Sequence, residues 1–262
     1  MKKHKVIIII LAVLLALESV FIAYLLFRRP KKLAPIPVAV APQVKGKIAI
    51  VLDDWGYNTR NLKFLDNLKY PLTFSVLPNL PYSASVARQL NRRGFEVILH
   101  LPMEPREEFR LEKGTVIISM DAEEIRRIIE ADLKSVNPVK GVSNHMGSRA
   151  TADLRTIKVV FKELKKKRLY FLDSLVAGSS VCQQVAKEER ISFAVRDVFL
   201  DNEEDPAYIR GQINQLKVKA EIHGYAVGIG HDRKNTLEVL RETMPQLAKE
   251  GYRFVFVSEV AR

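Results

Sequence analysis

Cysteine is almost absent from this chain of 262 residues, with Cys182 as its single representative. One cysteine excludes a disulfide within the chain and also excludes a zinc site built from cysteines, so we interpret Cys182 as a buried structural thiol. Glycine-rich phosphate motifs are missing too: no Gly-x-Gly-x-x-Gly follows the first predicted strand, and there is no phosphate-binding loop. We therefore expect no nucleotide ligand.

Acidic residues are scarce only at the start of the chain. The 42 Lys and Arg residues exceed the 30 Asp and Glu residues, for a net charge of +12. Residues 1–47 hold nine bases and one acid, so the remaining 33 bases and 29 acids give the rest only about +4. The run Lys165-Lys166-Lys167-Arg168 ends a predicted helix and has no aromatic residues within it. Basic residues suit a helix C-terminus, so we interpret the run as a solvated helix end and expect no nucleic-acid partner.

The longest apolar run covers residues 6–27 and is interrupted only by Glu18, Ser19 and Tyr24. Its length suits a bilayer core of about 30 Å. Bases lie on both sides of it, so their distribution does not define an orientation. We predict a basic tail (1–5), a transmembrane anchor or uncleaved signal (6–27) and a Pro-rich linker (28–46), with a cleaved signal peptide as the alternative. The protein is then membrane-anchored, with its folded part outside the cytoplasm, in the periplasm or at the cell surface.

Residues 47–262 have the length of one domain, in which apolar strand patterns alternate with helix patterns seven or eight times. This alternation predicts a parallel α/β fold, either a barrel or an open doubly wound sheet. Polar residues follow many different strands rather than one switch point. We therefore predict a distorted (β/α) barrel of seven or eight strands, preceded by one N-terminal transmembrane helix. Its predicted strands are 48–52, 72–77, 95–99, 139–143, 169–172, 192–198, 225–229 and 253–257.

Adjacent carboxylates end the first predicted strand, where Asp53-Asp54 follows five apolar residues. Like charges side by side are costly unless a cation or a shared proton relieves them. Three histidines, His100, His145 and His231, also follow apolar runs. Asp and His side chains gathered at strand ends can form a divalent-metal site. The alternative is that the aspartates cap the next helix and the histidines are ordinary loop residues.

Ordered sequence blocks then resemble a known family. Ile50-Val51-Leu52-Asp53-Asp54-Trp55-Gly56 is similar to the first motif of the polysaccharide deacetylase superfamily, and Val227-Gly228-Ile229-Gly230-His231 is similar to its last. The closer resemblance is to the divergent polysaccharide deacetylases. The segments of this chain that carry the resemblance are His100-Leu101-Pro102-Met103-Glu104-Pro105, Asn144-His145-Met146-Gly147-Ser148, Phe171-Leu172-Asp173-Ser174 and Phe199-Leu200-Asp201-Asn202.

The resemblance implies roles for single residues. The second aspartate of the pair, Asp54, would bind a divalent metal together with His100, with zinc as the expected ion, and the first aspartate, Asp53, would act as the catalytic base. His231 would be the catalytic acid. Glu104 stands where ordinary family members carry a second metal-binding histidine, four residues after His100. We expect His145 to replace that ligand, with Glu104 as the alternative ligand or as a loop carboxylate paired with Arg106 or Arg149.

Further candidates surround these residues. Asp173 or Asp201 would orient His231 or belong to the second shell of the metal, although each could instead cap a helix. Trp55, Asn144, Ser148 and Arg149 are candidates for substrate contact. The resemblance implies an envelope-anchored, metal-dependent hydrolase that deacetylates N-acetylated amino sugars of a cell-wall or envelope polysaccharide. Two alternatives remain: a catalytically altered glycan- or protein-binding regulatory module, and a peptide amidase or ester deacylase on the same scaffold.

Overall fold

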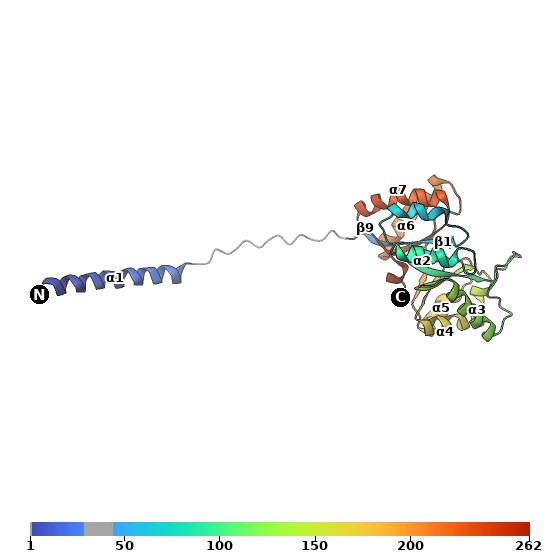
Figure 1. The fold of residues 1–262 in the computed structure, drawn as a ribbon, viewed down its shortest axis with the longest axis horizontal. Helices are drawn as coiled ribbons and strands as arrows, with labels where there is room; N and C mark the ends of the chain where they lie inside the picture. The colour runs from blue at the N-terminus through green and yellow to red at the C-terminus, as the bar shows by residue number, and fades with distance from the viewer. Residues whose placement is uncertain (1, 29–43) are drawn as a thin grey trace. The chain divides into compact units, whose positions relative to one another are not determined.

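We describe a computed structural model of the chain, which covers residues 2–28 and 44–262 (Figure 1). The chain divides into two units, Met1–Ala41 and Pro42–Arg262. Most of the predicted linker, 28–46, lies outside the described residues. In the first unit, helix α1 (Lys2–Phe27) confirms the predicted N-terminal apolar helix. Its segment Lys3–Phe27 is long and apolar enough to cross a membrane, and none of this segment is buried.

The second unit is a parallel α/β domain, as predicted. Within residues 44–262, nine strands form one sheet in the order β6-β5-β4-β3-β2-β1-β8-β7, with β9 paired to β1. The strands are β1 (Gly46–Trp55), β2 (Thr73–Val76), β3 (Glu96–Met103), β4 (Gly141–Met146), β5 (Tyr170–Asp173), β6 (Phe193–Val195), β7 (Val198–Phe199), β8 (Tyr225–His231) and β9 (Tyr252–Val255).

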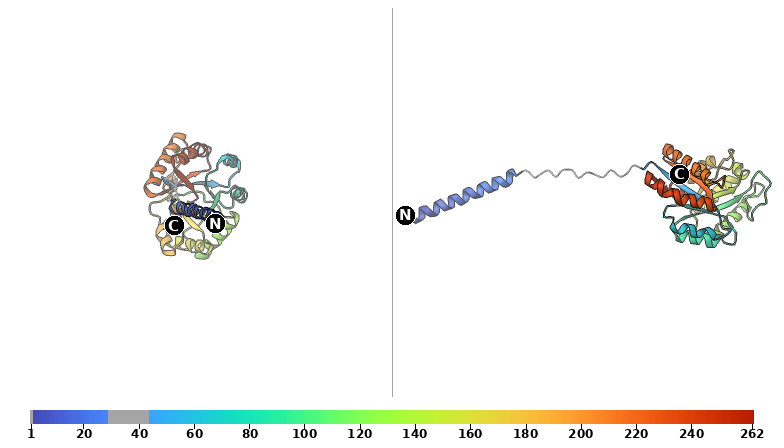
Figure 2. Two further views of the ribbon diagram at one scale, coloured as in Figure 1. Left: turned by 90° about the vertical axis from the view of Figure 1, so that its left-hand side faces the viewer. Right: turned by 90° about the horizontal axis from the view of Figure 1, so that it is seen from above.

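Helices surround the curved sheet, as the end-on view in Figure 2 shows. They are α2 (Ser83–Arg92), α3 (Ala122–Ser135), α4 (Leu154–Lys167), α5 (Cys182–Glu189), α6 (Pro206–His223) and α7 (Lys234–Glu250), with short 3₁₀ helices at Arg60–Asn67, Ala150–Ala152 and Val257–Glu259. Their starts follow from sequence: Asp121, Asp153 and Asp205 each cap a helix with the side chain. Such caps satisfy backbone N–H groups that have no partner within the helix.

The predicted strand 192–198 is two short strands instead. β6 pairs with β5, whereas β7 pairs with β8 at the opposite end of the strand order. Arg196 and Asp197 connect them, so one stretch of chain reaches both edges of the curled sheet. Unpaired sheet edges are a liability, and here both edge strands, β6 and β7, are very short.

The core consists of two clusters of buried side chains, one on each face of the sheet. Along β1, Ile48, Ile50 and Leu52 belong to one buried cluster, while Ala49 and Val51 belong to the other. Because successive strand side chains point to opposite faces, both faces of the sheet are covered, as in parallel sheets generally. Both clusters consist of residues from Ile48 onward, so the core of the second unit is self-contained.

Candidate metal and catalytic site

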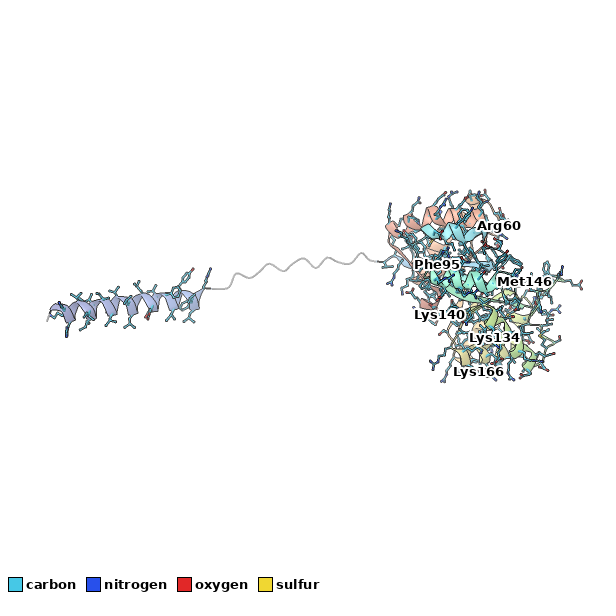
Figure 3. The ribbon with its side chains drawn as sticks, viewed as in Figure 1. Arg60, Phe95, Lys134, Lys140, Met146 and Lys166 are labelled. Carbon is cyan, nitrogen blue, oxygen red and sulfur yellow. The ribbon has the colours of Figure 1, made fainter. Side chains whose placement is uncertain are left out.

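Acidic and histidine side chains meet at the end of the sheet where the strands finish. Asp53 and Asp54 lie near the end of β1, His100 in β3, His145 in β4 and His231 at the end of β8. All the paired strands are parallel, so these ends lie on the same side of the domain. In Figure 3, Met146 marks this end of β4, and Lys140 marks the other.

A bulge in β1 allows two consecutive aspartates to face one site. The pairing with β2 shifts register between Leu52 and Trp55, and Asp54 has a left-handed backbone with φ of 65°. Without this irregularity, successive side chains would point to opposite faces of the strand. As a result, both carboxylates approach His100: its Nε2 lies 3.6 Å from Asp53 Oδ2 and 3.4 Å from Asp54 Oδ1.

Three donor atoms form a tight triangle. His100 Nε2 and His145 Nδ1 are 3.2 Å apart, and they lie 3.4 and 3.3 Å from Asp54 Oδ1. Ligands about 2.0–2.2 Å from a tetrahedral zinc ion would lie about 3.3–3.6 Å from one another. The spacing, the mixed N and O donor set and the burial of His100 therefore fit a divalent ion held by Asp54, His100 and His145.

The polar atoms of this triangle support the same interpretation. Asp54 Oδ1 is buried without a hydrogen-bond partner among the described residues. Burial alone would raise the pKa of Asp54, but the imidazoles of His100 and His145, 3.4 and 3.3 Å from its Oδ1, hold that pKa well below its usual range. Asp54 is thus an anion with an unused acceptor, which is what a cation ligand requires.

Two serines, which our sequence reasoning missed, orient His100. Ser143 Oγ lies 2.8 Å from His100 Nδ1 and 2.6 Å from Ser75 Oγ. This contact directs the other ring nitrogen, Nε2, toward Asp54. Ser143 lies two residues before His145 on β4, and that spacing places both on one face of the strand. The alternation along the strand was the signal that could have identified Ser143.

Glu112 is a second residue that sequence reasoning missed. Its Oε1 lies 3.5 Å from His145 Nε2, the ring nitrogen that faces away from the triangle. Burial alone would lower the pKa of His145, but the contact with Asp54, the charge of Asp54 and the charge of Glu112 together raise it. Glu112 lies in the loop between β3 and α3, and no strand pattern indicates which way that loop folds.

His231 has the partner that we expected for a catalytic acid. Its Nδ1 lies 2.7 Å from Asp201 Oδ1, while Asp201 Oδ2 accepts hydrogen bonds from the His231 backbone N–H and from Thr236. Burial alone would lower the pKa of His231, but the hydrogen bond and charge of Asp201 raise it. The ring also stacks on Phe199, with centroids 5.9 Å apart.

Asp53 differs from its neighbour in its environment. It is 2% exposed and lies opposite His231 in the register of β1 and β8. Burial, the largest influence, and the charge of Asp54 raise its pKa, against the opposing effects of His100, His231 and Ser75. Two adjacent carboxylates therefore have pKa values shifted in opposite directions, an arrangement that separates the role of a proton acceptor from that of a charged ligand.

Comparisons with known proteins agree with this geometry. A sequence profile described as divergent polysaccharide deacetylase matches residues 50–261. The chain belongs to the divergent polysaccharide deacetylase family. It is 35% identical over 207 residues to the uncharacterized protein YibQ of Escherichia coli K12, and the match covers 79% of this chain and 65% of that relative, slightly less than two thirds.

Solved structures show the same fold as this member of the divergent deacetylase family. An uncharacterized protein of Agrobacterium tumefaciens C58 superimposes with a TM-score of 0.78 at 22% identity, over 84% of this chain and 91% of that one. The peptidoglycan deacetylase PdaC of Bacillus subtilis superimposes with a TM-score of 0.51 at 16% identity, over 84% and 91% of the two chains. At these identities the likeness concerns the fold alone.

Glu104, the alternative metal ligand expected from the sequence, is not part of the triangle. Its Oε1 lies 3.0 Å from an Arg149 guanidinium nitrogen, and its Oε2 accepts a 2.7 Å hydrogen bond from the Ile118 backbone. Both oxygens are therefore engaged in holding loops together. The structure favours the loop-carboxylate interpretation of Glu104, with Arg149 rather than Arg106 as its partner.

Asp173 also has a structural role. Its two oxygens accept hydrogen bonds from Leu175 N at 2.8 Å and from Ser180 Oγ at 2.6 Å. These contacts shape the loop after β5. Asp201 is therefore the partner of His231, and Asp173 is not.

Two candidates for substrate contact, Trp55 and Asn144, require correction because they are buried. Trp55 is 0% exposed and packs edge-on against Phe74, so it has no surface on which a sugar ring could stack. Asn144 is 1% exposed, and its amide connects Ser174 N with Met146 O. Ser148 accepts a hydrogen bond from the Arg106 backbone and donates one to Glu107, which braces the loop. Arg149, besides pairing with Glu104, remains half exposed.

Proposed function

We propose that this protein is a metal-dependent hydrolase that removes acetyl groups from N-acetylated amino sugars of a cell-wall or envelope polysaccharide. The observation that carries the proposal is the triangle of Asp54, His100 and His145, together with Asp53 and its register partner His231, which pairs with Asp201. Membership of a deacetylase family supports the reaction class. The name of the structural neighbour PdaC, a peptidoglycan deacetylase, supports the substrate class.

The ion would be held by Asp54 Oδ1, His100 Nε2 and His145 Nδ1, and zinc suits two imidazoles and one carboxylate. When bound, such an ion supplies a Lewis acid that polarises a carbonyl oxygen and lowers the pKa of water at its open position. Through its contact with His100 Nδ1, Ser143 keeps the other ring nitrogen, Nε2, turned toward Asp54 Oδ1. Partners of this kind in the second shell commonly fix the orientation of histidine ligands.

Asp53 and His231 would then move the protons. Asp53, with its raised pKa, is suited to accept a proton from the attacking water. His231, with a pKa raised by Asp201, is suited to deliver a proton to the leaving amine nitrogen. The two residues are register partners on adjacent strands, so they can act on the two sides of one amide bond.

The N-terminal helix supports an envelope location. Lys3–Phe27 could span a bilayer, and residues 29–43 would connect it to the domain. We propose that the protein is anchored in the membrane with its catalytic domain outside the cytoplasm. An anchored enzyme suits a substrate that is itself an immobile polymer.

Acetate release provides the test. Residues 44–262 loaded with zinc are incubated with N-acetylglucosamine oligosaccharides and with peptidoglycan fragments, and the products are measured by mass spectrometry. We expect loss of acetyl groups, which Asp53→Asn abolishes while it retains the metal, and which His145→Ala abolishes together with metal binding. A metal-loaded protein that binds these glycans but releases no acetate would contradict the enzyme and favour the binding module.

A further inference from the structure

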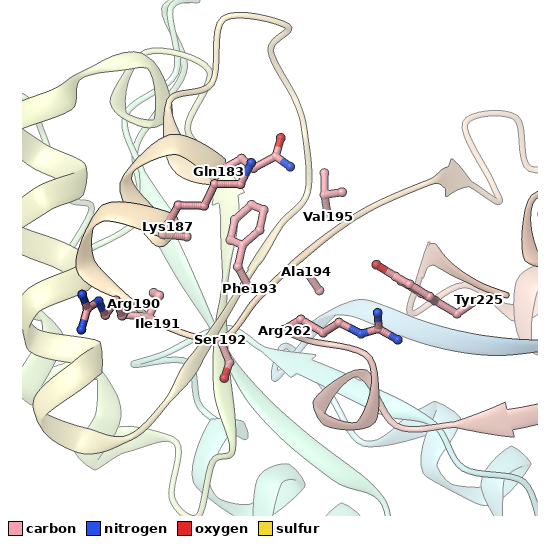
Figure 4. Close-up of a pocket in the computed structure, with 11 residues that line it drawn as sticks. Gln183, Lys187, Arg190, Ile191, Ser192, Phe193, Ala194, Val195, Tyr225 and Arg262 are labelled. Atoms are coloured by element: carbon pink, nitrogen blue, oxygen red, sulfur yellow. The ribbon is translucent and has the colours of Figure 1, made fainter. Parts of the chain in front are cut away.

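Two adjoining pockets lie at the end of the domain where the strands begin, opposite the candidate active site. One, of about 490 Å³, lies between α5, β6 and the start of β8 (Figure 4). The other, of about 440 Å³, lies beside the starts of β4 and β5. They share Arg190, Ile191 and Ser192, so together they form one continuous hollowed surface.

This surface is basic. Neither pocket is lined by an Asp or Glu among the described residues. Six exposed cations line it. They are Arg262 and five that we call the basic face: Lys140, Lys165, Arg168, Lys187 and Arg190. Within residues 44–262, none of the five forms a side-chain ion pair with a carboxylate, in contrast to Lys158, which pairs with Glu188 at 3.1 Å. Lys165 donates only to the Glu189 backbone carbonyl.

Helix ends explain part of this charge but not all of it. Lys165 and Arg168 lie at the end of α4, and Lys187 and Arg190 at the end of α5, where cations suit the helix dipole. Lys140 comes from the loop before β4 and belongs to no helix. The convergence of these side chains on one pair of pockets therefore exceeds what the dipole requires.

The same end of the domain receives the preceding chain. Lys45 N donates to Gly251 O and Lys47 N donates to Gly224 O, immediately before β9 and β8 begin. From Gly46 to Asp53 the strand rises by about 23 Å at ~3.3 Å per residue. In Figure 3, Lys140 lies just before the start of β4 and Met146 lies at its end, so the two labels mark the two ends of the domain.

We propose that the basic face binds the anionic headgroups of a phospholipid bilayer. The proposal rests on the proposed membrane anchoring, since a tethered domain meets the bilayer surface at high local concentration. Long cationic side chains that form no ion pair with a carboxylate are attracted to anionic lipid over roughly a Debye length. Docking by this face would turn the Asp54–His100–His145 site away from the bilayer and toward a polymer outside it.

Vesicle binding tests the proposal. Residues 44–262, whose core is self-contained and which lack the apolar helix, are sedimented with vesicles of phosphatidylglycerol and phosphatidylcholine or of phosphatidylcholine alone. We expect binding to the anionic vesicles at low salt, weaker binding at high salt, and none to the neutral vesicles. The triple variant Lys165→Gln, Lys187→Gln, Arg190→Gln should bind roughly 100-fold more weakly, at about fivefold for each charge removed.

A matched control removes the same charge elsewhere. Lys63, Arg88 and Lys234 are exposed bases outside the two pockets, and their triple Gln variant should bind nearly as well as the parent. Circular dichroism checks that both triple variants are folded. Equal loss in the two variants, equal binding to neutral vesicles, or no binding to anionic vesicles would overturn the proposal.

Binding of a soluble polymer in place of vesicles would identify a different ligand for the basic face. If a soluble anionic polysaccharide binds the basic face while anionic vesicles do not, the face recognises the polymer and the membrane proposal is wrong. Acetate release does not enter any of these measurements. Failure of vesicle binding therefore leaves the deacetylase proposal standing, and failure of acetate release leaves this one standing.

Discussion

Replacing Asp132 by asparagine should stabilise the domain above neutral pH. Asp132 lies on α3 and is 1% exposed. Its Oδ1 accepts a 2.7 Å hydrogen bond from Asn79, whereas its Oδ2 is buried without a partner among the described residues. Burial raises the pKa of Asp132 from 3.8 to about 7, and the Asn79 hydrogen bond opposes this only in part. Among residues 44–262, no cation pairs with Asp132 to compensate for the charge when its carboxyl ionises.

The sign of the pH dependence follows from this shift. The folded domain keeps a proton that the unfolded chain releases between pH 3.8 and about 7. The retained proton therefore stabilises the folded domain fully below pH 3.8. This stabilisation decreases between pH 3.8 and about 7 and does not change further above that range. At 1.36 kcal/mol per pKa unit, the loss amounts to about 4 kcal/mol. Asparagine does not ionise, but its amide N–H would lack an acceptor at a cost of about 1–3 kcal/mol.

Urea unfolding of residues 44–262 across this pH range measures the effect. We expect Asp132→Asn to be more stable than the parent by about 1–3 kcal/mol above pH 7, which corresponds to a few degrees in Tm. The stability difference between the two proteins should change by up to about 4 kcal/mol from acid to alkaline pH. Glu130→Gln, an exposed change on the same helix, is the control and should show neither effect. A stability difference that is the same at all pH values would refute the reasoning.

Three other changes test the site and the core. Asp201→Asn should lower the pKa of His231, because the ring loses both the charge-assisted hydrogen bond and the negative charge of Asp201; an NMR titration of the His231 ring that is unchanged would contradict the pairing. Ser143→Ala should weaken zinc binding about 10–100-fold through loss of the contact with His100, measured by competition with a chelator, and Ser143→Thr should recover part of it. Trp55→Ala should destabilise the domain by about 3–5 kcal/mol in urea unfolding, whereas a change under 1 kcal/mol would mean that Trp55 is not a core residue.

The sequence alone was sufficient for much of the fold. Its apolar runs predicted the strands, because a parallel sheet buried on both faces requires continuous apolar segments. Helices begin after Asp121 and Asp205 for a reason that is also local: the side-chain oxygen of each residue caps free backbone N–H groups. The ordered blocks around Asp53-Asp54 and His231 indicated the family, and a match over residues 50–261 confirms it.

Tertiary structure decided which of the candidate side chains face one another. Sequence could not choose between Asp173 and Asp201 as the partner of His231, because each follows an apolar strand in the same way. It also could not place Trp55 in the core or direct Glu104 toward Arg149, since both outcomes depend on loops packed from distant parts of the chain.

The bulge in β1 shows the physical reason for this division. Strand and helix patterns are local, because they depend on residues that are close together in the sequence. The site depends on a register shift against β2, which turns Asp53 and Asp54 to the same side and brings both within 3.6 Å of a histidine on β3. Register and side-chain direction are set only when separate strands pair and pack, so the residue types of the site were determined by the sequence and their convergence by the folded structure.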